Sequence, residues 1–106
     1  MTQVLDIAGA SGATYRFRRH QEREELPATA GNVIYVRRDD ASWALICCAE
    51  IDSLREAFRG WKVAQTVHRA TDVFIRLNVS RAKRHEECLD IAEKHEPPMR
   101  TLETNL

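Results

Sequence analysis

The sequence predicts an α+β fold, in which a small mixed or antiparallel sheet carries helices on its faces. The main indication is the apolar run 43–49, followed within a few residues by apolar side chains at helical spacing between Leu54 and Trp61. Two pairs of short apolar runs, each separated by turn-forming residues, indicate hairpins. With 43% hydrophobic and 30% charged residues, the 106-residue chain has the composition of one soluble domain.

A hairpin is expected at the N-terminus, from strands over 4–7 and 13–20. Aromatic and basic residues alternate along the second run, as in an edge strand with one wet face. The connection contains Gly9 and Gly12, whose Gly-x-x-Gly spacing also occurs in phosphate-binding loops. Because this one precedes a strand and not a helix, it predicts a turn.

The centre of the fold is expected to be a second hairpin followed by a helix. Residues 32–36 are apolar on both faces, which favours an interior strand, and 43–49 returns as its partner after a polar loop. Asp52 or Ser53 caps a helix over 52–60, which Gly60 ends.

The last third of the chain predicts a short helix over 61–69, a strand over 71–77 and a helix over 80–95. Ser80 caps the last helix, and Pro97-Pro98 stops it. We expect a single domain over 1–106, with the hairpin in 1–20, a core in 31–100 and a loosely held tail in 101–106.

Charge and cysteine content exclude several classes of protein. Sixteen basic and sixteen acidic side chains cancel, so no global field attracts a polyanion, and no apolar run approaches a membrane span. The N-terminus lacks the pattern of a signal peptide. Cys47 and Cys48 are adjacent in a strand and point to opposite faces, so we expect three thiols, no disulfide and a cytoplasmic location. The lack of a membrane-spanning run predicts no membrane partner.

The order of elements and several short strings resemble the GIY-YIG endonuclease family over residues 31–100. In chain order they stand for its Gly-x-Tyr element, its Tyr-Ile-Gly element, the Glu-Thr-x-x-Leu after it, its third strand and its closing helix. The strings are Gly31-Asn32-Val33, Cys47-Cys48-Ala49, Glu50-Ile51-Asp52-Ser53-Leu54, Thr71-Asp72-Val73-Phe74-Ile75 and Cys88–Arg100. The N-terminal hairpin resembles an extension of one bacterial branch. The resemblance implies a ββαβα core.

The resemblance also implies that the catalytic groups are lost. The family uses two tyrosine hydroxyls, a helix arginine and a glutamate that binds a divalent metal. Val33 and Cys47 stand at the two tyrosine positions, Ala57 at the arginine position and Cys88 at the glutamate position, and none of them can fill these roles. Tyr35 lies close to the first tyrosine position, and Ala49 stands at the motif glycine. These six residues are the vestigial cleft positions. The resemblance therefore implies no catalytic residue and no cofactor.

An endonuclease with shifted residues stays open as an alternative. Glu87 would replace the glutamate, and Arg55 or Arg59 the arginine. One step along a helix turns a side chain by about 100°, which makes such replacement awkward.

The cysteines suggest a second chemistry. Cys47 and Cys88 both map to the former cleft, and His68 or His85 as a third ligand would suit zinc. Buried cysteines usually behave as small hydrophobes, so no metal site is expected.

Basic residues Arg55, Arg59 and Lys62 follow i, i+4, i+7 spacing, so on one helix they could form a stripe along a phosphate backbone. A solvated face balanced by Glu50 and Glu56 is the simpler interpretation.

From the resemblance and the lost catalytic groups, we expect an inactive GIY-YIG-like binding module, with weak, non-specific nucleic acid as its partner. A protein partner or a homodimer on the same scaffold is the alternative.

Overall fold

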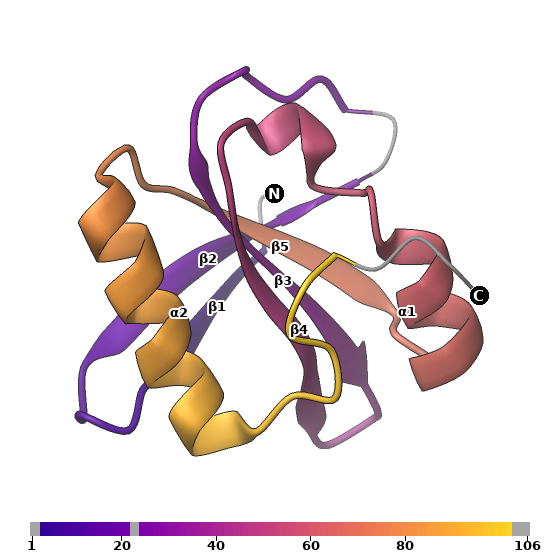
Figure 1. Cartoon of the computed structure of the whole chain (residues 1–106). Helices are drawn as coiled ribbons and strands as arrows, with labels where there is room; N and C mark the ends of the chain where they lie inside the picture. Colours follow the sequence, from indigo (N-terminus) through magenta and orange to yellow (C-terminus); the bar gives the residue numbers. More distant parts are fainter. Residues whose placement is uncertain (1–2, 22–23, 103–106) are drawn as a thin grey trace.

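The computed structural model describes residues 3–21 and 24–102 and has an α+β fold, as expected. Five antiparallel strands form one curled sheet in the order β1-β2-β5-β3-β4 (Figure 1). The strands are β1 (Val4–Ala8), β2 (Thr14–His20), β3 (Gly31–Arg38), β4 (Trp43–Ile51) and β5 (Asp72–Leu77). The helical elements are the 3₁₀ turn η1 (Leu54–Glu56), α1 (Trp61–His68) and α2 (Arg81–His95).

Strand β3 is an inner strand of the second expected hairpin, and β5 joins that hairpin to the first. Strand β3 pairs with β4 on one side and with β5 on the other, and residues 31–36 are all buried. The N-terminal hairpin extends the sheet through three residue pairs between β2 and β5, beginning at Arg18. The expectation of an interior strand apolar on both faces is therefore confirmed.

Each face of the sheet has its own apolar cluster. We call them the α1-side cluster, which lies under η1 and α1, and the α2-side cluster, which lies under α2. Because strand residues alternate between faces, Cys47 joins the α1-side cluster and Cys48 the α2-side cluster. The predicted opposite orientation of these two cysteines is confirmed.

The prediction of a helix over 52–60 is wrong. Ser53 does cap a helical turn, since its hydroxyl accepts from the Arg55 N–H at 3.3 Å, but η1 ends at Glu56. Gly60 then precedes α1 with φ −99°, so it starts a helix instead of ending one. The side chain of Tyr35 binds the backbone inside this break, which explains why local helical spacing does not persist.

Helix α2 follows the prediction closely. The Ser80 hydroxyl accepts from the Lys83 N–H at 3.3 Å, and the helix ends at His95 before the two prolines. No helix among the described residues is long and apolar enough to cross a membrane.

The segment after the prolines is held more firmly than expected. Met99 is fully buried, and its N–H donates to the Ile46 carbonyl at 3.0 Å beside a parallel bridge to Cys47. Leu102 packs against the α1-side cluster. The prediction of a loose tail is wrong for residues 101–102, and 103–106 lie outside the described residues.

The Gly-x-x-Gly segment forms the expected turn and is anchored by α2. Gly12 has φ +90°, which a glycine adopts without strain. The Asp90 carboxylate accepts from the Ser11 hydroxyl at 2.6 Å and N–H at 2.8 Å, and from the Tyr15 hydroxyl at 2.6 Å. These hydrogen bonds, that of the Ser11 hydroxyl first, lower the pKa of Asp90. The turn thus binds the protein's own carboxylate.

Candidate functional site

An open cavity of about 650 Å³ lies along the outer edge of β4. Met99 covers this edge at Ile46 and Cys47, and the cavity begins at the next residue, Cys48. Its walls come from β4, α2, the turn after η1 and the segment after Met99, which crosses beside β4 in Figure 1. The lining residues are Cys48–Ile51, Glu56, Arg59, His85, Cys88, Leu89, Ala92 and Arg100–Leu102. We call this feature the β4-edge cavity.

The charges around the β4-edge cavity are mixed. His85 Nδ1 lies 3.1 Å from a carboxylate oxygen of Glu50, and Arg59 lies 3.7 Å from Glu56. Arg100 adds a second guanidinium. Two arginines therefore face two glutamates and a histidine, over a lining that also holds aliphatic side chains and two thiols. Such a surface suits a ligand that is partly apolar and carries charges of both signs.

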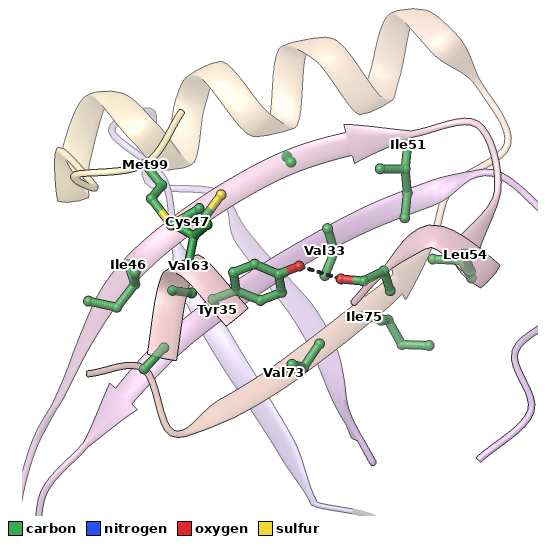
Figure 2. Close-up of a cluster of buried hydrophobic side chains, with 14 of the residues drawn as sticks. Val33, Tyr35, Ile46, Cys47, Ile51, Leu54, Val63, Val73, Ile75 and Met99 are labelled. Carbon is green, nitrogen blue, oxygen red and sulfur yellow. Dashed lines mark hydrogen bonds between the residues drawn. The ribbon is translucent and has the colours of Figure 1, made fainter. Parts of the chain in front are cut away.

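Five of the six positions that the resemblance assigns to a cleft come together in the structure. Val33, Tyr35, Cys47, Ala49 and Ala57 are all buried in the α1-side cluster, between the sheet and the segment from η1 to α1 (Figure 2). The sixth, Cys88, lies on α2 and packs against the α2-side cluster. These five residues thus form core on one face of the sheet, with Cys88 apart on the other.

The hydroxyl of Tyr35 is committed to the backbone. It donates to the Ala57 carbonyl at 2.5 Å and accepts from the Gly60 N–H at 3.2 Å. The Trp61 ring packs edge-on against the Tyr35 ring, with the two ring centroids 5.2 Å apart. Figure 2 shows, as a dashed line, the hydrogen bond that the labelled Tyr35 makes within the cluster. Burial raises the pKa of Tyr35 well above its ordinary value. This hydroxyl positions a turn and does not face a substrate.

The thiols pair differently from the prediction. Cys48 Sγ lies 3.0 Å from Cys88 Sγ, whereas Cys47 lies on the opposite face and donates to the Thr101 carbonyl. The expectation that Cys47 and Cys88 share a cleft is therefore wrong, because strand alternation sends Cys47 to the α1 side. Sequence reasoning missed Cys48, although that same alternation pointed to it.

A metal centre finds no support among the residues that the structure describes. They contain no group of three or more His, Cys, Asp or Glu side chains placed to hold an ion. Glu87, which the shifted-residue alternative would use as the metal-binding glutamate, pairs with Arg76 at 2.9 Å and does not line the β4-edge cavity.

The basic stripe is divided among three elements. Arg55 donates from Nε to the Leu26 carbonyl at 3.3 Å and lines a separate, smaller cavity with Phe58. Arg59 lines the β4-edge cavity, and Lys62 lies exposed on α1. The predicted single helical face is wrong, because the helix that would carry it is interrupted. Arg59 instead shares the cavity with Arg100.

Comparisons with known proteins returned no match to a protein-family model, to a curated protein or to a solved structure. Membership of the GIY-YIG family therefore stays a prediction.

Replacing Tyr35 by phenylalanine is expected to destabilise the fold by about 1–3 kcal/mol, because the Ala57 carbonyl and the Gly60 N–H lose a buried partner. Chemical denaturation followed by circular dichroism measures the loss. The matched control is Tyr15→Phe, since its half-buried hydroxyl bonds a carboxylate that keeps two bonds from Ser11. Equal losses in the two variants would contradict the role given to Tyr35.

Proposed function

We propose that this chain is a GIY-YIG-like domain without nuclease chemistry, which acts as a binding module through the β4-edge cavity. The described elements from β3 onward support the proposal. They follow the order of paired strands, helix, strand and helix before a proline turn that the resemblance implies.

One observation carries the proposal. Residues at the former catalytic positions Val33, Cys47 and Ala57 are packed in an apolar core, while an open cavity persists beside them at the β4 edge. Ala49 belongs to both features, so the cavity adjoins the vestigial site. Loss of the reacting groups with retention of a lined opening favours binding over catalysis.

Phosphodiester hydrolysis makes demands that these residues do not meet. It needs a metal to generate hydroxide and cations to neutralise the developing charge. The metal-binding glutamate position holds Cys88, whose soft sulfur suits magnesium poorly. Glu87 is occupied by Arg76 outside the cavity, which weighs against a nuclease with shifted residues.

The cavity's chemistry favours a polypeptide segment as its ligand. Leu89, Leu102 and Ile51 offer apolar contacts, and the arginines alternate with Glu50 and Glu56. A polyanion would meet both carboxylates as well as the cations, whereas a peptide can present apolar side chains with charges of either sign.

The absence of nuclease activity is directly testable. Purified protein incubated with plasmid or single-stranded DNA, in magnesium or manganese between about pH 6 and pH 9, should leave the DNA intact. Gel electrophoresis against a mock purification is the measurement. Metal-dependent cleavage that Glu87→Ala abolished would overturn the proposal and favour the shifted-residue endonuclease.

Peptide binding at the cavity is tested by substitution of an exposed wall residue. Peptides selected from a random displayed library should bind Leu89→Glu at least roughly ten-fold more weakly than the parent, because a carboxylate replaces an apolar contact. Val67→Glu on α1 is the control, since both side chains are 57% exposed and Val67 lies outside the cavity. Failure to select any peptide, or equal weakening by both substitutions, would contradict a peptide site here.

Nucleic acid is the second candidate, favoured by the two guanidinium groups of the cavity. In that case Arg59→Ala with Arg100→Ala should reduce the slope of log K against log salt by up to about two units, one per phosphate contact. Arg55→Ala with Lys62→Ala is the matched pair outside the cavity. Fluorescence anisotropy of labelled duplex DNA supplies the slopes. A slope that the cavity pair leaves unchanged would exclude phosphate binding at this site.

A further inference from the structure

We propose that Cys48 and Cys88 form a reversible dithiol–disulfide site, which a hydroperoxide oxidises and a small dithiol reduces. This inference goes beyond the binding role, because it concerns a covalent modification of the cavity wall.

The geometry brings two thiols from different elements to bonding range. Cys48 on β4 and Cys88 on α2 are 40 residues apart in sequence, and their sulfur atoms lie 3.0 Å apart. A disulfide bond is about 2.05 Å long, so closure requires an approach of about 1 Å. Both residues line the β4-edge cavity, which admits a small oxidant.

The two thiols differ in a way that assigns the order of reaction. Cys48 is only 4% exposed, and its hydrogen bond with Cys88, together with burial, raises the pKa of Cys48. Cys88 is half-buried and the more accessible of the two. Cys88 is therefore the sulfur that meets the oxidant, and Cys48 is the sulfur that resolves the product.

The reaction balances with hydrogen peroxide as the oxidant. The Cys88 thiolate attacks the O–O bond, takes one oxygen as sulfenic acid and releases hydroxide, so the sulfur loses two electrons to the peroxide. The Cys48 sulfur then attacks the Cys88 sulfur. The S–O bond breaks, and the departing hydroxide takes the Cys48 proton to form water. Dithiothreitol reverses the change by thiol–disulfide exchange and becomes a cyclic disulfide.

The position of Cys47 keeps it from competing with Cys48 for Cys88. Cys47 is adjacent to Cys48 in sequence but lies in the α1-side cluster, across the sheet from Cys88.

A disulfide between β4 and α2 joins two elements that already pack together. It should therefore restrict the unfolded chain more than it distorts the folded one.

The test is peroxide treatment of the whole chain under native conditions. Oxidised protein should lose the mass of two hydrogen atoms and retain one titratable thiol after denaturation, and peptide mapping should show the Cys48–Cys88 linkage. Its melting temperature should rise on the order of 10 °C above that of the reduced protein. Dithiothreitol should restore three thiols and the original melting temperature.

Three variants separate this site from general cysteine oxidation. Cys47→Ala should still lose two hydrogens, whereas Cys88→Ala should resist oxidation because Cys48 is buried. Cys48→Ala should accumulate a sulfenic acid at Cys88, which dimedone traps. Circular dichroism of each variant before treatment verifies folding. Three remaining thiols in the oxidised parent, a linkage that includes Cys47, or a fall in melting temperature would each overturn the proposal.

Discussion

The burial of β3 on both faces is the constraint on which the rest of the structure depends. Its residues 31–36 are covered on both sides and hydrogen-bonded to β4 and β5, so the sheet needs a layer over each face. Gly31 shows how close the approach is. A methyl group there would lie 2.4 Å from the Arg76 carbonyl oxygen and 2.8 Å from Leu54. One face takes η1 and α1, and the other takes α2.

The two layers give the edge of β4 its unusual character. On the α1 side, Tyr35 holds the turn after η1, and Met99 adds a further contact along β4. Beyond Met99 the described residues leave the β4-edge cavity along this edge, and α2 forms its opposite wall. The β4-edge cavity and the thiol pair therefore lie at the same place, because both are formed by β4 and the facing helix α2.

The sequence alone determined the α+β class, the central β-hairpin and the helix that follows Ser80. Each depends on residues that are close together in sequence: alternating or continuous apolar residues, turn residues between them, and a capping hydroxyl before a helix. Alternation also determined that Cys47 and Cys48 face apart. The prolines at 97 and 98 marked the end of α2 for the same local reason.

Only the tertiary structure decided how these elements meet. Local spacing favoured a helix over 52–60, but the Tyr35 hydroxyl binds the backbone at Ala57 and Gly60 and stabilises a break. That break separates Arg55 from Arg59, and the return of the chain after α2 brings Arg100 to the cavity instead. Contacts between residues far apart in sequence depend on packing, which no local pattern records. The approach of Cys48 to Cys88 across 40 residues is of this kind.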